Sequence, residues 1–309
     1  MALADRTSVG ARAPVSKRSR AARAEPFVYL SPAIILLLVF VAYPVLRSMW
    51  LSVNEVSILG GISGFVGVEN FGTIFTDGHF GHYVAVTAFW TFGAVALQFL
   101  FGMAGALLLN GKLPMRGTVR GLLMIPWATP SVLVALIWLW LLDPNHGLVN
   151  ATLTNLHLID HPVTWLSDPA TALPSLIMVD VWQGVPFFAV MILAALQGVS
   201  HELVESSRLD GCGAIQTFRH VTLPAILPTI LITLLLRVIW TANYVDLALI
   251  MTGGGPAEAT TALPLQSYLT AYKGGDFGSG AAYAVVQAAV LMAFVVLYVR
   301  QSHQQEENR

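Results

Sequence analysis

Six long apolar stretches, separated by polar segments, account for most of the chain. They cover about residues 27–51, 83–109, 121–142, 172–198, 224–250 and 278–299. Each reaches the roughly 20 mostly apolar residues that an α-helix needs to cross the hydrocarbon core of a bilayer. The pattern predicts an all-α, polytopic membrane protein with six transmembrane helices.

The composition agrees with a chain that lies mostly in the membrane. Of its 309 residues, 56% are hydrophobic and 11% are charged, and the mean hydropathy is +0.69. Soluble domains have roughly 45–50% apolar and about 25% charged residues, so little of this chain is left for a soluble domain. The net charge of −1 gives no overall field for nucleic acid, and the single Cys212 excludes an internal disulfide.

Basic residues are concentrated on one side of the predicted spans, which sets the orientation of the chain. The N-terminal tail, two alternate loops and the C-terminal tail hold thirteen of the sixteen Lys and Arg: Arg6, Arg12, Lys17, Arg18, Arg20, Arg23, Lys112, Arg116, Arg120, Arg208, Arg219, Arg300 and Arg309. Because cytoplasmic segments carry the excess of Lys and Arg, both termini are predicted to be cytoplasmic. We expect a disordered basic tail over 1–26, in contact with anionic lipid, a membrane domain over 27–300 and a second tail over 301–309.

The cytoplasmic loop over 200–223 has the pattern of a helical hairpin. Ser200 is a candidate N-cap, and Gly211 is placed to end the first helix in a left-handed conformation. Pro224 suits the first turn of the following span. A second short helix is predicted from the apolar residues Ile215, Phe218 and Val221.

The spacing in this loop resembles the EAA signature of ABC-importer permeases. That signature is Glu, two small residues, three variable residues, Gly, nine variable residues and then Ile-x-Leu-Pro. The matching positions here are Glu205, Ser206, Ser207, Gly211, Val221, Leu223 and Pro224. The resemblance implies that the hairpin docks into a groove on an ATPase subunit. The contact would be made by Glu205, Ser206, Ser207, Asp210 and Gly211. The alternative is an ordinary cytoplasmic loop with solvated charges.

From about residue 27 to 299 the sequence resembles the carbohydrate class of these permeases. Within that class it is similar to the type represented by the larger permease of the maltose importer. It is carried by stretches such as 181–187 (Val-Trp-Gln-Gly-Val-Pro-Phe) and 251–256 (Met-Thr-Gly-Gly-Gly-Pro). The resemblance implies a bacterial inner-membrane subunit that pairs with a second homologous permease, two ATPase subunits and an extracytoplasmic sugar-binding protein. ATP and Mg would be bound by the ATPase, since this chain has no phosphate-binding G-x-x-x-x-G-K-[ST] motif, and we expect no cofactor in this chain.

Two predicted spans carry polar residues on one helix face each. Asp180, Gln183, Gly184 and Phe187 recur at i, i+3, i+4 and i+7, and Arg237, Thr241 and Tyr244 recur at i, i+4 and i+7. At a rise of about 1.5 Å per residue, Asp180 and Arg237 fall at similar depths. Both faces are therefore predicted to line one cavity, somewhat external of the midplane.

The chemistry of these seven residues favours a sugar site. Sugar hydroxyls need hydrogen-bond donors and acceptors, and an aromatic ring covers the apolar face of a sugar. Gly184 is expected to leave room for the ring, and the family resemblance places substrate contacts at the same seven positions. Alternatively, Asp180 and Arg237 form an ion pair that only fixes helix register. An unpaired Arg237 would instead indicate an anionic solute such as glycerol phosphate.

Two other classes of protein are alternatives. A proton-coupled secondary transporter would use Asp180 and Asp246 as proton-binding carboxylates, but it has no need of the signature loop. An intramembrane enzyme would need a nucleophile–base pair or a metal site at membrane depth, and the sequence offers neither. We therefore expect a transport subunit without catalytic residues.

Overall fold

The computed structural model describes residues 20–111 and 114–307, which are mostly helical. The chain divides into two compact units after Arg47. In the first unit, α1 (Arg20–Leu37) and the π-helical turn η1 (Leu38–Ala42) lead into α2 (Tyr43–Ser52). Large apolar side chains of this segment, such as Phe40, are exposed, which suits a helix surrounded by lipid.

The helices at both ends of the chain extend beyond the predicted boundaries. Residues 20–26 belong to α1, and residues 301–307 belong to α14 (Phe277–Glu307), although both segments were expected in the tails. Both segments are rich in good helix formers, such as Ala, Arg, Gln and Glu. Residues 1–19 of the predicted tail, Lys112 and Arg309 lie outside the described residues.

Five described helices are long and apolar enough to cross a membrane. They are Tyr29–Ser52, α4 (Phe80–Asn110), α8 (Pro169–Gln197), Ala214–Met251 and Phe277–Gln301. A sixth candidate is the pair α5 (Arg116–Ala128) and α6 (Ser131–Leu141), which is bent by 94°. Six spans result when this pair counts as one, as predicted.

The span predicted over 121–142 is not one continuous helix. The chain leaves the helical conformation at Thr129, which has ψ 129°, and α6 starts after Pro130. Proline disfavours the α conformation in the residue before it and cannot donate a backbone hydrogen bond. The break between α5 and α6 therefore follows from the Thr129-Pro130 dipeptide.

The span over Ala214–Met251 is also interrupted. α10 (Ala214–Thr217), the π-helical turn η2 (Phe218–Thr222) and α11 (Leu223–Ala242) follow one another without a gap, so the second short helix predicted in the loop continues into the span. The wide turn η2 lies directly before Pro224, whose ring lacks an N–H. The helix then ends at Ala242, and α12 (Asp246–Met251) begins after three residues.

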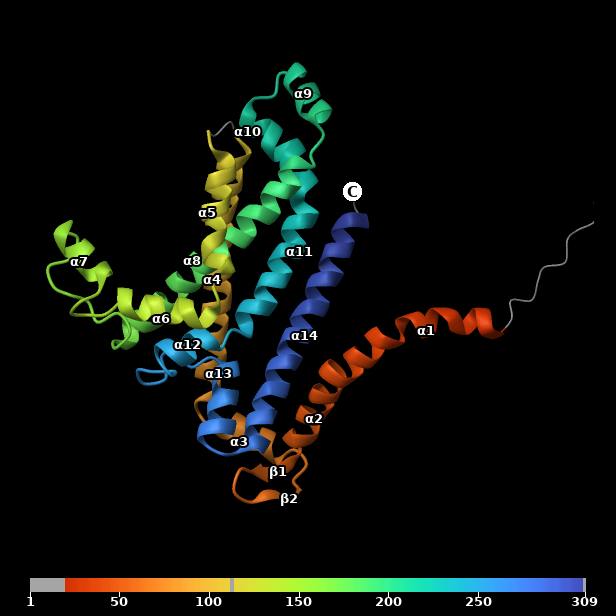
Figure 1. Cartoon of the computed structure of the whole chain (residues 1–309), viewed down its shortest axis with the longest axis vertical. Coiled ribbons are helices and arrows are strands. Elements are labelled where there is room, and N and C mark those ends of the chain that lie inside the picture. The colour runs from red at the N-terminus through yellow and green to blue at the C-terminus, as the bar shows by residue number, and fades with distance from the viewer. Residues whose placement is uncertain (1–19, 112–113, 308–309) are drawn as a thin grey trace, which may run out of the picture. The chain divides into compact units, whose positions relative to one another are not determined.

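Helices α4 and α8 form the centre of the second unit (Figure 1). Gly102 of α4 allows their close approach, because a Cβ there would collide with Phe188 and the α8 backbone. Two buried clusters surround the pair. One joins α4 and α8 to α6 and α12, and the other joins them to α11. Along α8 the first cluster ends at Val181 and the second begins at Phe188, and the polar site described below falls between them.

The two ends of the second unit are built differently (Figure 1). One end carries α9 (His201–Leu209) and α10. The other carries the antiparallel strands β1 (Asn54–Ser57) and β2 (Gly61–Phe65), followed by α3 (Glu69–Thr76). The remaining elements are α7 (Leu148–Asn155), α13 (Leu263–Tyr268) and the π-helical turn η3 (Leu269–Lys273).

The loop that connects α6 to α8 is ordered by polar side chains. Buried Asn150 bonds the carbonyls of Pro144 and Val163 and accepts from the indole of Trp165. At the turn that begins at Asp143, the carboxylate accepts hydrogen bonds from the backbone N–H groups of residues 146 and 145, at 2.7 and 3.0 Å. These bonds hold the pKa of Asp143 below its usual range.

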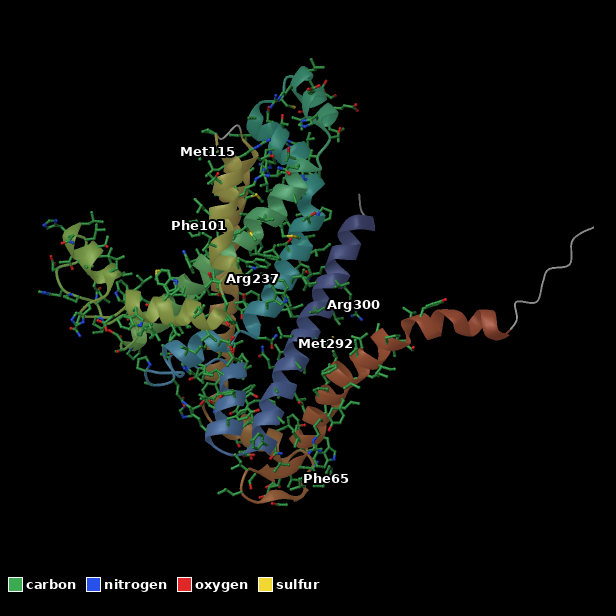
Figure 2. All side chains as sticks on the ribbon, viewed as in Figure 1. Phe65, Phe101, Met115, Arg237, Met292 and Arg300 are labelled. Atoms are coloured by element: carbon green, nitrogen blue, oxygen red, sulfur yellow. The ribbon has the colours of Figure 1, made fainter. Side chains whose placement is uncertain are left out.

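Apolar side chains cover the outward faces of the long helices of the second unit. Phe101 of α4 and Met292 of α14 are more than half exposed, and Figure 2 shows them pointing away from the bundle, whereas Arg237 lies among the helices. Exposed apolar surface on this scale is expected of helices that face lipid.

Candidate functional site

The cavity

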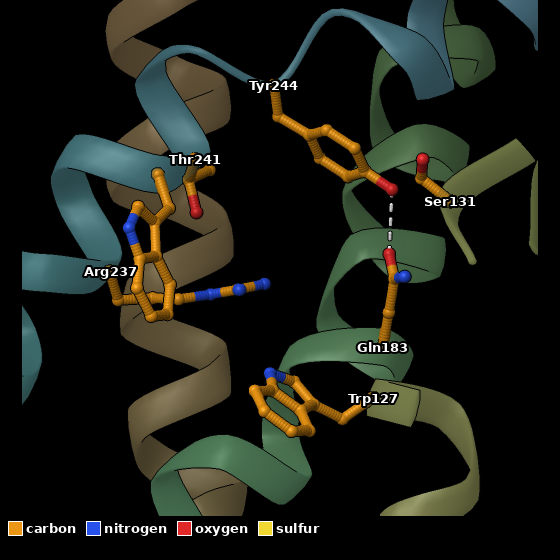
Figure 3. Close-up of a pocket in the computed structure, with 7 residues that line it drawn as sticks. Trp127, Ser131, Gln183, Arg237, Thr241 and Tyr244 are labelled. Carbon is orange, nitrogen blue, oxygen red and sulfur yellow. Dashed lines mark hydrogen bonds between the residues drawn. The ribbon is translucent and has the colours of Figure 1, made fainter. Parts of the chain in front are cut away.

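A cavity of about 180 Å³ lies where the two interrupted spans meet α8. Figure 3 shows the Arg237 side chain and the Trp127 ring directed toward the same space, with Tyr244 and Gln183 on its other side. The residues that line it are Trp127, Ser131, Gln183, Arg237, Trp240, Thr241 and Tyr244. Arg237 is the one charged residue among these seven.

The cavity is formed by the two helix breaks. Trp127 and Ser131 flank the α5–α6 break, while Thr241 precedes the α11–α12 break and Tyr244 lies within it. Gln183 of α8 joins the two breaks: it donates to the Thr129 carbonyl at 3.3 Å and accepts from the Tyr244 hydroxyl at 2.7 Å. Non-helical backbone is tolerated at membrane depth where it lines a polar cavity, and this arrangement fits that rule.

A second link between the breaks joins the first residues of the two helices that follow them, α6 and α12. Ser131, at the first position of α6, donates to the carboxylate of Asp246, at the first position of α12, at 2.7 Å. The helices α6 and α12 also pack together in one buried cluster, through residues such as Val134 and Leu247. The two breaks are therefore connected by packing and by three side-chain hydrogen bonds.

Asp180 and Arg237 form a buried ion pair behind the cavity. The Arg237 Nη2 lies 3.0 Å from the Asp180 carboxylate, which also accepts from the Trp90 indole at 3.3 Å. The Arg237 Nε donates to Gln98 at 2.6 Å, and Gln98 in turn donates to the Asp180 carbonyl at 3.0 Å. The Asp180 side chain is fully buried, while 11% of the Arg237 side chain remains exposed. The predicted match in depth between these two residues is confirmed.

Gly184 makes this network possible, although not in the expected way. A Cβ at position 184 would overlap the Arg237 guanidinium and the Gln98 amide. The space that was expected to hold a sugar ring is therefore filled by these two side chains. The glycine serves close packing of the ion pair.

The cavity wall offers unused hydrogen-bonding capacity. Thr241 is 4% exposed, lines the cavity, and its hydroxyl has no hydrogen-bond partner among the described residues. A buried hydroxyl without a partner is costly, so the site favours a ligand or water that bonds to it.

Aromatic rings form a layer at one side of the cavity. Trp127 and Trp240 line it, and Phe187 contacts both of them, with ring centroids 6.3 and 5.2 Å away. Phe187 itself is not among the lining residues. Trp127 and Trp240 thus present ring surface to the cavity, and Phe187 supports them from behind.

The structure separates the seven predicted site residues into two groups. Gln183, Arg237, Thr241 and Tyr244 line the cavity. Asp180, Gly184 and Phe187 pack behind it, and substrate contacts by any of the seven stay a prediction. Five further residues of the site were not predicted from the sequence: Trp90, Gln98, Trp127, Ser131 and Trp240. A lone Gln98 within an apolar span and the Thr129-Pro130 break were the available signals.

The α9–α10 hairpin

The turn of the α9–α10 hairpin has the predicted glycine geometry. Gly211 has φ +85°, directly after the end of α9. The N–H of Gly211 bonds the Arg208 carbonyl, and the N–H of Cys212 bonds the Ser207 carbonyl, both at 3.0 Å. These two bonds define a Schellman motif, for which glycine is the favoured residue. Ser200 occupies the N-cap position as predicted, but its side chain makes no capping bond.

The predicted contact residues of the hairpin differ in exposure. Glu205, Ser206, Asp210 and Gly211 are exposed. Ser207 is buried, and its hydroxyl bonds the Val204 carbonyl at 2.8 Å and the Thr217 hydroxyl at 3.0 Å. Ser207 therefore joins the two arms of the hairpin from inside.

The tip of the hairpin carries exposed apolar side chains. Leu209 is 89% exposed and Ile215 is 83% exposed, on either side of the Gly211 turn. Figure 1 shows this hairpin projecting beyond the long helices of the second unit. An apolar tip with a polar surround is typical of a surface that binds another protein.

Comparison with known proteins

The chain matches a known family of membrane transport proteins. Residues 98–305 match the model of the binding-protein-dependent transport system inner membrane component. The trehalose/maltose transport system permease protein MalF of Thermococcus litoralis is 31% identical over 274 residues, which cover 89% of this chain and 92% of that protein. The sulfoquinovosyl glycerol transport system permease protein SmoG of Agrobacterium fabrum is 34% identical over 272 residues, 88% of either chain.

A solved structure has the same fold. A chain of a bacterial ABC transporter involved in the import of the acidic polysaccharide alginate aligns with a TM-score of 0.80 and 22% identity. The alignment covers 91% of this chain and 96% of that one. The chain described here therefore belongs to the family of inner-membrane components of binding-protein-dependent transport systems. It is a multi-pass membrane protein of the permease class.

Proposed function

We propose that this chain is a permease subunit of an ATP-driven importer for a saccharide. The observation that carries the proposal is the cavity, where aromatic rings and hydrogen-bonding side chains meet at two broken spans. The Thr241 hydroxyl, which has no hydrogen-bond partner among the described residues, suits a sugar hydroxyl, and the Trp127 and Trp240 rings suit the C–H face of a sugar ring. The carbohydrate ligands named for the related transporters support the same class of solute.

The small volume of the cavity points to one sugar ring as its occupant. Sites for drug-sized ligands usually enclose about 300–1,000 Å³, well above the 180 Å³ found here. A second permease subunit would complete the binding site from the facing side. An external binding protein would deliver the sugar to the pair.

The energy for transport would come from ATPase subunits, which bind ATP and Mg. These subunits would dock at the α9–α10 hairpin. Leu209, Ile215 and the signature residue Glu205 are all exposed on this hairpin and would be available to such a partner. The excess of Lys and Arg in the segments on this side of the spans supports a cytoplasmic position for this hairpin and for both chain termini. This chain would carry out no bond chemistry of its own.

The mechanism that we propose is alternating access at the two helix breaks. α10, η2 and α11 form one uninterrupted helical segment from the hairpin to the α11–α12 break. Movement of the hairpin would therefore be transmitted to Tyr244, and through Gln183 to the α5–α6 break. A contiguous element that can take two discrete arrangements is the physical basis for long-range coupling.

Uptake in a strain that lacks this chain, complemented with the wild type, tests the proposal. The probes are radiolabelled mono-, di- and trisaccharides together with glycerol phosphate. Uptake of at least one saccharide should stop when ATP is depleted and persist when the proton gradient is collapsed. The opposite pattern would support the secondary transporter, in which Asp180 and Asp246 bind the coupling proton.

A charge reversal at the hairpin tests the coupling surface. Glu205→Lys should abolish uptake and ATPase association, whereas Glu202→Lys, an exposed position on the same helix outside the signature, serves as the matched control. Normal association in the Glu205→Lys variant would mean that the ATPase is held elsewhere.

A further inference from the structure

The charge distribution around the cavity points to the kind of saccharide that it accepts. Arg237 is the one charged residue among those that line the cavity, and its guanidinium is paired with the fully buried carboxylate of Asp180. The pair contributes no net charge to the wall. An anionic solute would therefore meet a compensated arginine, whose attraction for it is largely cancelled.

The arginine is also fixed in place. Its Nη2 is bonded to Asp180 and its Nε to Gln98, and the absence of a side chain at Gly184 lets both partners pack tightly against it. To turn toward an anion, Arg237 would have to leave the carboxylate of Asp180 buried and unpaired, which is strongly unfavourable. The remaining exposed part of Arg237 can donate to a neutral hydroxyl without this rearrangement.

A second carboxylate stands at the edge of the cavity. Asp246 is exposed and accepts a hydrogen bond from Ser131, which lines the cavity. The two carboxylates of Asp180 and Asp246 and the single guanidinium of Arg237 give a net formal charge of −1 close to the cavity. An approaching carboxylate, sulfonate or phosphate would be repelled.

We infer that the cavity selects uncharged saccharides against sugar acids and sugar phosphates, and that Asp180 is the positioning residue that sets this selectivity through Arg237. The inference rests on the proposed saccharide function.

Equilibrium binding to the complete transporter complex in lipid nanodiscs, without the external binding protein, tests the inference. The radiolabelled probes are glucose and trehalose as neutral sugars and glucuronate and glucose 6-phosphate as charged ones. The wild type should bind glucose more tightly, by a factor on the order of ten, than glucuronate or glucose 6-phosphate.

Two variants separate selectivity from folding. Asp180→Asn leaves Arg237 uncompensated and should lower or invert the ratio of neutral to charged binding. Asp180→Asn combined with Arg237→Gln removes both charges, avoids an unpaired buried ion, and should restore the preference for neutral sugars. Asp160→Asn, an exposed loop position, is the control and should leave the ratio unchanged.

The outcomes distinguish this inference from the proposed function. If wild-type protein binds glucuronate or glucose 6-phosphate as tightly as glucose, or if Asp180→Asn leaves the ratio unchanged, the selectivity inference is wrong while a saccharide site stands. If no probe of either kind binds, the saccharide function itself fails, and the inference fails with it.

Discussion

The cavity and the α9–α10 hairpin depart in opposite ways from the usual placement of polar and apolar side chains. The cavity region keeps an ion pair, and a Thr241 hydroxyl that bonds to no described residue, inside an apolar bundle, whereas the hairpin exposes Leu209 and Ile215 at its tip. Each departure costs stability in the isolated chain. The difference indicates two different missing partners: a polar solute completes the cavity, and a protein surface covers the hairpin.

The two regions also differ in how they are held together. The cavity depends on contacts between residues far apart in the sequence, such as Asp180 with Arg237 and Gln98 with Arg237. The hairpin is fixed by bonds between residues no more than ten positions apart, including Ser207 with Thr217. Substitutions in the cavity should therefore affect the whole bundle, and those in the hairpin should act locally.

The largest effect is expected when one partner of the buried ion pair is removed. Arg237→Ala leaves the fully buried Asp180 carboxylate without its cation and should lower the free energy of unfolding by about 3–5 kcal/mol. Thermal unfolding of the purified protein in detergent measures the loss, with Arg116→Ala at an exposed position as control. Equal melting temperatures for the two variants would show that the pair does not stabilise the bundle.

A smaller effect, confined to partner binding, is expected at the hairpin tip. Leu209→Asp places a charge on a highly exposed apolar position and should weaken association with the ATPase by about 2 kcal/mol, roughly 30-fold. The fold itself should be unaffected. Co-purification and surface plasmon resonance measure the affinity, and Leu158→Asp, an exposed leucine outside the hairpin, is the control. Unchanged affinity in Leu209→Asp would remove the tip from the interface.

Overpacking behind the cavity is expected to lower the free energy of unfolding by an amount similar in size to that loss of binding energy. Gly184→Ala forces Arg237 and Gln98 to shift and should cost about 1–3 kcal/mol. Gly105→Ala is the matched control on α4, because its Cβ would meet Ala189 at an ordinary 3.5 Å and a helical alanine is favoured. The two melting temperatures should move in opposite directions. A tolerated Gly184→Ala would mean that the network is loosely packed.

The smallest effect is expected inside the hairpin. Ser207→Ala removes the bond to Thr217 and should destabilise the hairpin by about 1 kcal/mol. Hydrogen exchange of the α9 amides should become about fivefold faster, while Ser206→Ala, at the exposed neighbour, should change little. Identical exchange in both variants would contradict the internal role assigned to Ser207.

The features that the sequence predicted well depend on short-range rules. Gly211 takes the left-handed conformation expected of a residue that ends a helix. The depth of Asp180 and Arg237 followed from the rise per residue alone, and the ion pair left open as an alternative is present. The number of spans followed from length and hydropathy.

The features that the sequence did not predict depend on packing between distant segments. Hydropathy averaged over a span hides a break, so Thr129-Pro130 was included in the span predicted over 121–142 without a bend being noticed. Gln98 and Trp90 of α4 could be assigned to the ion pair only once α4 was placed against α8. For the same reason Gly184 was expected to leave open space, although Gln98 and Arg237 occupy it.

Reconstituted transport gives the most direct test of the central claim that an external ATPase drives solute through this cavity. The complete complex is placed in vesicles with the binding protein, a labelled neutral saccharide and ATP, with and without an imposed proton gradient. We expect the saccharide to accumulate only when ATP is present and to the same extent with and without the proton gradient. Accumulation should be lost in the Glu205→Lys variant. Accumulation by this chain alone, driven by the gradient without any nucleotide, would contradict the account.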